Sequence, residues 1–246
     1  MEYVKQRRTI RKYADKSIEP SLLHELLQVS GRASTMGNLQ LYSVVVTRDE
    51  EMKKKLAPAH FNQPMVTQAP VVLTFCADFR RTSIWCEERK AVPGYDNFLS
   101  FFNASIDTLL YAQTFCTLAE EKGLGICYLG TTIYNPDPII DTLQLPRLVM
   151  PVTTVTVGWP AEHPAQPDRL PVESYVHEEV YHDYTAADID RFYSYKESLE
   201  ENRHFVEVNH KETLAQVFTD IRYTKKDNEA LSKVYLKALQ RQGFLE

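Results

Sequence analysis

The spacing of hydrophobic residues predicts helices alternating with strands along most of the chain. In residues 20–33, Leu22, Leu23, Leu26 and Val29 fall on one helical face, behind a proline that suits the first helical turn. Runs of β-branched and apolar residues are typical of strands. Such runs occur at 41–47, which we expect to be a buried strand, and at 69–78, 124–130 and 151–160. Further helices are expected at 2–13 (a short one, leading into a basic segment), 49–57 (charged and on the surface), 135–143, 186–201 and 226–242.

Residues 98–123 form the most apolar helical segment. Hydrophobic side chains occupy nearly its whole circumference as far as Glu120, and a helix of this kind is buried on all sides. The pattern predicts a central helix, or one that is shared with a second subunit. Residues 79–97 show no clean periodicity and are expected to be irregular. The Pro-, His- and Tyr-rich stretch 161–185 is expected to be an extended arm on the surface.

Composition narrows the class of protein. The 246 residues suit a single domain, and a net charge of −5 argues against general affinity for nucleic acid or an anionic membrane. We expect no secretory signal and no membrane span, because no long apolar run is present. Four cysteines without a C-x-x-C pair predict free thiols in a reducing cytoplasm, with no zinc site and no dithiol.

Four short stretches carry candidate chemistry. The segment QRRTIRKYAD at 6–15 places arginines around a hydroxyl, a combination typical of phosphate binding, although a solvated charged turn is the alternative. The loop STMGNLQ at 34–40 offers small polar groups and a glycine that lets backbone approach a ligand; alone it is also an ordinary connection. YLGTT at 128–132 ends a strand, where ligands often bind. PDRLP at 167–171 holds an arginine stiffly between prolines.

Competing motifs are absent. The sequence contains no G-x-G-x-x-G, no phosphate-binding G-K-[ST] loop, no G-x-S-x-G and no H-E-x-x-H. The histidines and acidic residues of 177–183 match no metal-ligand spacing, so we expect no metal site. Aromatic residues are not interleaved with basic ones as on a nucleic-acid surface.

Taken in order, these stretches resemble the nitroreductase family. The resemblance rests on the opening RRTIRKYADKSIEPSLLHELLQVSGRASTMGNLQ, then on NQPMVTQAPVVLTFCAD (62–78), EKGLGICYLGTTIYN (121–135) and VGWPAEHPAQPDRLP (157–171). The final NEALSKVYLKALQRQGFLE (228–246) is similar to the long-tailed, NADPH-preferring branch of oxygen-insensitive nitroreductases and flavin reductases.

The resemblance implies an α+β sandwich, in which helices wrap a central, mainly antiparallel sheet and the domain is shared in a homodimer. It implies two FMN molecules at the dimer interface. We expect residues 1–185 to form the FMN-binding domain. Residues 186–246 are expected to be a C-terminal helical extension that packs on the same domain or on the partner subunit.

The resemblance also implies the site. The basic segment lies along FMN, with Arg169 reaching the phosphate from the far arm and Arg11 beside the ring edge, where it favours reduction. The loop contacts the ribityl chain and ring edge, Gln63 the pyrimidine edge, and the strand end presents backbone N–H groups to N5. The implied FMN contacts are Arg7, Arg8, Thr9, Arg11, Ser34, Thr35, Met36, Asn38, Gln40, Gln63, Tyr128, Leu129, Gly130, Thr131 and Arg169.

Two positions depart from the branch. Pro167 stands where a lysine is common, so one phosphate contact is lost or supplied elsewhere. Thr131 follows Gly130 where two glycines are common, and its side chain is expected to narrow the space over the ring. No position aligns clearly with the region that binds the extra phosphate of NADPH. The basic residues near it have no assigned role: Arg203, Lys211, Arg222, Lys225 and Lys226.

The function that the resemblance implies is FMN-dependent, ping-pong transfer of two electrons from NADPH or NADH to nitroaromatics, quinones or related acceptors. Protons can come from water, so no side chain is named as catalytic. One alternative is a flavin reductase that supplies reduced FMN. Another is an FMN-binding protein without turnover, in which Thr131 or the tail blocks the ring face.

Overall fold

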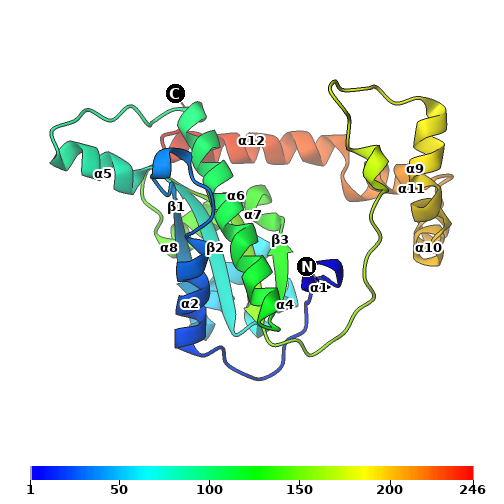
Figure 1. The fold of residues 1–246 in the computed structure, drawn as a ribbon, viewed down its shortest axis with the longest axis horizontal. Coiled ribbons are helices and arrows are strands. Elements are labelled where there is room, and N and C mark those ends of the chain that lie inside the picture. The colour runs from blue at the N-terminus through cyan, green and yellow to red at the C-terminus, as the bar shows by residue number, and fades with distance from the viewer. Residues whose placement is uncertain (1, 246) are drawn as a thin grey trace. The chain divides into compact units, whose positions relative to one another are not determined.

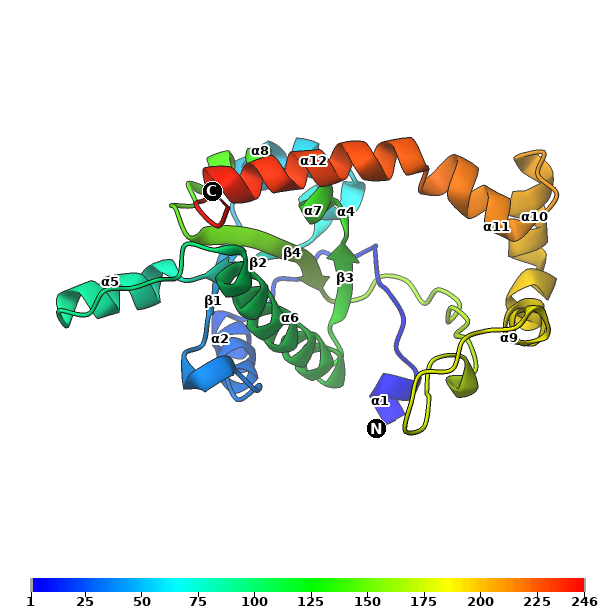
Figure 2. The same ribbon diagram turned by 90° about the horizontal axis from the view of Figure 1, so that it is seen from above.

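The computed structural model describes residues 2–245, and the chain divides into two compact units. One unit comprises residues 1–165 and 231–246, and the other residues 166–230. The first contains a four-stranded sheet in the order β1 (Tyr42–Thr47), β2 (Val71–Asp78), β4 (Val149–Gly158) and β3 (Gly125–Leu129) (Figure 1; β4 is labelled in Figure 2). Every neighbouring pair is antiparallel, which confirms the predicted sheet and all four predicted strands.

Position in the sheet explains one difference from the sequence prediction. β2 and β4 are central and buried throughout, whereas β1 is an edge strand with several half-exposed residues. The prediction that β1 is buried is therefore wrong. A β-branched run such as YSVVVT does not reveal whether both neighbouring places in the sheet are filled.

Helices cover both faces of the sheet (Figure 2). On one face lie α2 (Pro20–Ser30) and α6 (Phe98–Glu121), with a core that includes Leu73, Phe75 and Phe115. On the other face, Leu56, Val66 and Leu129 pack together beneath a set of short elements. These are α3 (Glu50–Leu56), the 3₁₀ turn η2 (Ala57–His60), α4 (Pro64–Gln68), α7 (Thr131–Tyr134) and α8 (Pro136–Leu143).

The chain returns to this core at its carboxyl end. Ala238 and Leu239, in the last turns of α12 (Lys225–Arg241), pack with Met150 of β4, and so does Phe244 beyond the helix. The tail is therefore an integral part of the first unit's core.

The helix α3, which was expected to lie on the surface, is partly buried. The Lys53 ammonium is buried and donates to the Ala69 carbonyl at 2.9 Å.

The long helix α6 is buried on one face only. Ala104, Ala112 and Phe115 are fully buried, whereas Leu99 is 68% exposed and Leu109 47% exposed. The same outer face carries further exposed apolar residues: Phe98, Phe102, Ile106 and Leu110. Burial on all sides is thus wrong for a single chain. The alternative, a helix shared with a second subunit, stays a prediction.

Several helices were not expected. α5 (Arg80–Glu88) occupies part of 79–97, where we predicted irregular structure. The Asp78 carboxylate accepts from the Arg81 N–H at 3.2 Å and helps to start this helix, which buries only small side chains such as Thr82 and Ser83. Because α5 packs so little, it leaves almost no hydrophobic period. α7 was also missed, and α1 (Glu2–Lys5) forms where a short helix was expected.

Residues 166–230 form their own helical unit. It contains a turn of 3₁₀ helix at Val172–Ser174, α9 (Ala186–Ser198), α10 (Glu200–Val208), α11 (Leu214–Val217) and a π-helical turn at Phe218–Arg222. α9 and α12 confirm the two predicted late helices, and α10 and α11 are additional. No helix within residues 2–245 is long and apolar enough to cross a membrane.

Candidate functional site

The basic segment is docked on the outer edge of the sheet at β3. The Ile10 N–H donates to the Ile126 carbonyl at 3.0 Å, and the Ile10 side chain is 4% exposed. The close fit requires Gly125, where a Cβ atom would lie 2.6 Å from the Cβ of Ile10. Tyr13 anchors the other end, with its hydroxyl 2.6 Å from Thr156 Oγ1 on β4. The apolar residues of the segment thus hold its arginines in place.

The arginines of this segment have different surroundings. Arg7 Nε lies 3.4 Å from Glu120 Oε1 near the end of α6, and both side chains are largely buried. Arg8 donates to the Pro164 carbonyl at 3.1 Å. Within residues 2–245, the exposed Arg11 guanidinium makes no hydrogen bond or ion pair. Arg11 is therefore the arginine best placed to meet a ligand.

Glu162 fixes the backbone beneath Arg11. One of its carboxylate oxygens accepts from the Arg11 N–H at 2.7 Å and from the Lys12 N–H at 3.0 Å. These backbone hydrogen bonds, led by that of Arg11, lower the pKa of the half-buried Glu162 carboxyl. Glu162 lies just beyond β4 and the bridge between Pro160 and Tyr13, so the sequence element VGWPAEHP holds the basic segment in place.

The small-residue loop is held by a buried carboxylate, Asp107 of α6, which is 1% exposed. Asp107 accepts from Thr35 Oγ1 at 2.5 Å, from the Met36 N–H at 2.9 Å and from the Leu41 N–H at 3.2 Å. The Thr35 hydroxyl in turn accepts from the Gln40 N–H at 2.9 Å. Ser34 and Asn38 lie on the exposed side of the loop.

Within the loop, backbone conformation is unusual. Gly37, Asn38 and Gln40 all have positive φ, at 55°, 56° and 49°. The Gln40 side-chain amide donates to the Asn38 carbonyl at 2.5 Å and to Asn38 Oδ1 at 2.7 Å, which stabilises the turn. The loop therefore has a defined conformation that is held by hydrogen bonds, and it is not a flexible connection.

The end of β3 joins a second sequence segment through a buried histidine. Leu129 is buried, Gly130 is exposed, and no atom lies within 4 Å of where a Gly130 Cβ would be. The Thr131 side chain is 6% exposed, and its Oγ1 lies 2.8 Å from His60 Nδ1. The hydroxyl is therefore turned inward, contrary to our expectation that it narrows the space above this edge.

Gln63, expected at the pyrimidine edge, follows His60 closely. Its backbone N–H donates to the His60 carbonyl at 3.1 Å, across Phe61 and Asn62, which both have positive φ. Half-buried, Gln63 precedes Pro64 at the start of α4. Gln63 and the Gly130–Thr131 turn thus belong to one local structure.

The predicted contacts form separate groups in one chain. The basic segment pairs with Glu120 and the loop with Asp107, thirteen residues earlier on α6, so the two anchors are about 20 Å apart along the helix. The loop leads into β1, whereas Gly130 follows β3. These two strands are the opposite edges of the sheet and are separated by three strand spacings, or about 14 Å. The basic segment and the Gly130 turn both lie beside β3, and the loop lies away from both.

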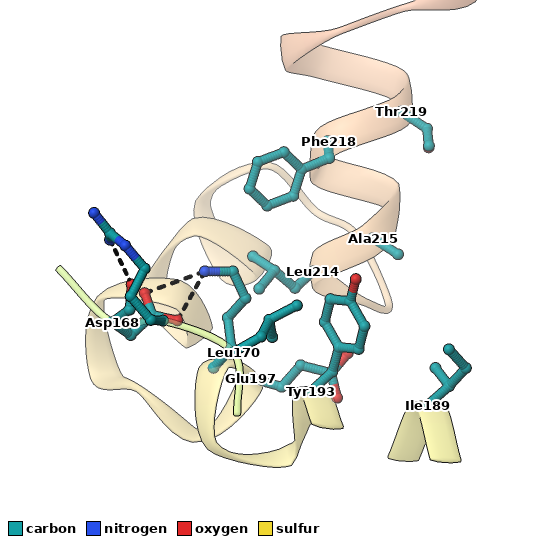
Figure 3. Close-up of a pocket in the computed structure, with 11 residues that line it drawn as sticks. Asp168, Leu170, Ile189, Tyr193, Glu197, Leu214, Ala215, Phe218 and Thr219 are labelled. Carbon is teal, nitrogen blue, oxygen red and sulfur yellow. Dashed lines mark hydrogen bonds and ion pairs between the residues drawn. The ribbon is translucent and has the colours of Figure 1, made fainter. Parts of the chain in front are cut away.

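Arg169 belongs to the second unit, where it is exposed and donates to the Asp168 carbonyl at 2.8 Å. Its neighbour Asp168 pairs with Lys196 at 2.9 Å, beside a cavity of about 750 Å³ (Figure 3). The cavity is lined mainly by apolar side chains: Leu170, Ile189, Tyr193, Leu214, Ala215 and Phe218. The predicted approach of Arg169 to the phosphate stays a prediction.

Three of the unassigned basic residues in this unit have partners within it, and one of these is Lys225, whose Nζ lies 3.8 Å from Glu229 Oε1. Lys211 pairs with Asp220 at 2.9 Å. The Arg222 guanidinium lies 4.4 Å from the Phe205 ring centre and 5.4 Å from that of Phe218. These cation–π contacts orient the Arg222 guanidinium, and its positive charge is not paired with a carboxylate in them.

Sequence reasoning missed the three residues that position these groups: Asp107, His60 and Glu162. Asp107 left a usable signal, because an ionisable residue inside an otherwise apolar helix needs a buried partner. His60 and Glu162 left none, since their partners lie 71 and about 150 residues away along the chain.

Comparison with known proteins identifies the family of the chain. Residues 4–159 match the nitroreductase family. The NAD(P)H FMN reductase of Bacillus subtilis (strain 168) is 33% identical over 179 residues, which cover 71% of each chain. The oxygen-insensitive NADPH nitroreductase of Salmonella typhimurium is 30% identical, also over 71% of each chain.

Solved structures extend the match over the whole chain. A Bacteroides fragilis NCTC 9343 protein, provisionally assigned as an oxidoreductase, is 70% identical with a TM-score of 0.99, and the alignment covers 100% of both chains. The NfrA1 nitroreductase of Bacillus subtilis is 27% identical with a TM-score of 0.86, over 99% of this chain and 98% of its own. Sequence motifs, sheet topology and these matches agree, and the chain belongs to the nitroreductase family.

Proposed function

We propose that this chain is an FMN-dependent NAD(P)H oxidoreductase whose flavin lies along β3. The observation that carries the proposal is the pairing, on one strand, of a docked arginine segment with an exposed glycine turn. Guanidinium groups bind phosphate, and Gly130 has open space where a side chain would stand, so a planar ring can approach the backbone. The residues present therefore fit FMN.

Bound FMN supplies hydride acceptance from NAD(P)H and two-electron transfer to an oxidised acceptor, in a ping-pong order. The chain's own residues bind and orient it. Arg8 and Thr9 are proposed for the phosphate end together with Arg169, and Arg7, paired with Glu120, holds that end of the segment against α6. Arg11 is proposed for the ring edge, where its positive charge favours the negative charge that reduction adds.

Backbone groups of residues 128–131 and the Gln63 side chain are proposed to contact the ring itself. The N–H groups at the start of α7 precede its first intrahelical hydrogen bond and are available to an acceptor on the ring. Because protons can come from water, no side chain is assigned as catalytic.

We further propose that the working form is a homodimer in which each subunit completes the site of the other. The loop with Ser34, Thr35, Met36, Asn38 and Gln40 lies at the sheet edge opposite β3. A second copy of the chain would bring these residues to the flavin that lies along β3 of its partner. The exposed apolar face of α6, with Leu99 and Leu109, is the surface that such a dimer would bury.

The acceptor is proposed to be a nitroaromatic, a quinone or free flavin. Flavin reduction is favoured by the relatives named FMN reductase. An FMN carrier without turnover is less well supported, because the inward Thr131 hydroxyl leaves the Gly130 turn open. Four buried cysteines without a disulfide suit our proposed location, the reducing cytoplasm.

A visible spectrum of the purified protein, before and after anaerobic NADPH, tests the proposal. We expect flavin absorbance that bleaches with NADPH and returns with a quinone or a nitroaromatic. Comparison of steady-state rates with free FMN as the acceptor separates nitroreductase from flavin reductase. A colourless protein that cannot be reconstituted with FMN would refute the assignment, and flavin that NADPH and NADH both fail to bleach would indicate a carrier.

A further inference from the structure

A buried imidazole connects the two segments proposed to contact the flavin ring. His60 is fully buried at the end of η2, and its Nδ1 lies 2.8 Å from Thr131 Oγ1. Thr131 begins α7 directly after the exposed Gly130. On its other side, the His60 carbonyl accepts from the Gln63 N–H. His60 is therefore hydrogen-bonded both to Gln63, through its backbone, and to the turn after β3, through its side chain.

The bond to Thr131 is the only side-chain hydrogen bond that His60 makes among the described residues. Nε2 is buried and lacks a partner in the part of the chain that the structure describes. In one ring tautomer Nδ1–H donates to Thr131 Oγ1, and in the other Nδ1 accepts the Thr131 hydroxyl proton; the contact is a hydrogen bond in both. Burial lowers the pKa of His60 to about 4, so the imidazole is neutral at neutral pH.

The Thr131 hydroxyl needs a hydrogen-bond partner because the side chain is buried. A β-branched side chain has few allowed rotamers, and this one is 6% exposed beside a glycine turn. With its hydroxyl bound to His60, the polar group of Thr131 is satisfied inside the protein. Without His60, the hydroxyl would either stay buried and unpaired or turn toward the open side at Gly130.

We propose that His60 is a positioning residue for the flavin ring, which holds the Thr131 hydroxyl inward and thereby keeps the backbone of residues 130–131 accessible. This inference rests on the proposed function. His60 itself touches no reacting atom. It acts on the cofactor through the Thr131 side chain and the Gln63 backbone.

Two amide substitutions test the geometry as a matched pair. In His60→Asn, an amide nitrogen stands at the δ position, where Nδ1 meets Thr131, whereas in His60→Gln the amide is one bond farther out. We expect His60→Asn to bind FMN within about threefold of the wild type. We expect His60→Gln to bind roughly tenfold more weakly, the effect of one lost hydrogen bond. Flavin fluorescence titration of the apoprotein measures both.

A second variant separates positioning from mere support of the fold. Thr131→Gly removes the side chain that His60 holds, so combining it with His60→Gln should restore FMN affinity. The absorption maximum and midpoint potential of the bound flavin should shift in His60→Gln and return in the double variant. Thr74→Val is the control, because it removes a buried hydroxyl without a partner elsewhere in the sheet and should alter neither readout.

The outcomes are distinguishable. If wild-type protein binds no FMN, the proposed function fails. If wild-type protein binds FMN and His60→Gln binds it equally well with an unchanged spectrum, the inference is overturned. It is also overturned if His60→Gln loses affinity and Thr131→Gly does not restore it, since His60 would then act on stability alone. Titrations are made well below the melting temperature of each variant.

Discussion

Substitution of Asp107 is the most direct test of the hydrogen bonds that hold the loop at 34–40. It is almost fully buried and accepts hydrogen bonds from the Thr35 hydroxyl and from the Met36 and Leu41 N–H groups. In Asp107→Ala these three donors lose their acceptor. Water can reach the Met36 side of the loop, whose side chain is 44% exposed, but not Leu41, which is 1% exposed.

The magnitudes follow from this difference in burial. An unpaired buried donor costs about 1–3 kcal/mol, which applies in full to the Leu41 N–H. The two donors that water can reach cost about 1 kcal/mol each, so Asp107→Ala should lower the free energy of unfolding by about 4 kcal/mol. In Asp107→Asn one oxygen remains, and its amide N–H₂ faces one donor. The expected loss for Asp107→Asn is about 2 kcal/mol.

Urea unfolding of the apoprotein measures these losses, with Asp96→Asn as the matched control. Asp96 is exposed and makes no hydrogen bond among residues 2–245, so its change should stay within about 0.5 kcal/mol of the wild type. If the loop detaches without global unfolding, the effect appears instead as faster amide hydrogen exchange at residues 36 and 41. Stability and exchange in Asp107→Ala that match those of Asp96→Asn would refute the reasoning.

Three further predictions concern the core, the docked segment and the interface. The pKa of His60 is about 4 in the folded state and ordinarily 6.5, so the unfolded chain takes up the proton first as the pH falls. The free energy of unfolding should therefore fall by about 3 kcal/mol between pH 6.5 and pH 4. Urea unfolding at several pH values should show that His60→Asn lacks most of this loss. Gly125→Ala should displace Ile10, lowering the melting temperature and weakening FMN binding, whereas Gly94→Ala, in open space, should change neither. Leu109→Asp, on the exposed face of α6, should convert a dimer to a monomer in light scattering; an unchanged mass would exclude this face as the interface.

Hydrophobic patterning was sufficient to locate the helices that bury a continuous apolar face and the strands that are rich in apolar residues. All four strands and the helices α2, α6 and α12 lie where the sequence predicted them, because each carries a continuous apolar run or an apolar helical face. α4, α5, α7, α10 and α11 were missed because short or weakly packed helices leave no such pattern. Family resemblance supplied the order of the motifs and, with it, the candidate site residues.

The family, the α+β class and the presence of an arginine segment can be recognised without a structure, because these depend on residue types in a fixed order. How that segment is used depends on the folded arrangement. Arg7 is paired with Glu120, the Arg11 guanidinium makes no hydrogen bond or ion pair among the described residues, and the Thr131 hydroxyl is turned inward to His60. These outcomes depend on contacts between residues far apart in the chain, and such contacts exist only once the sheet edges and α6 are in place.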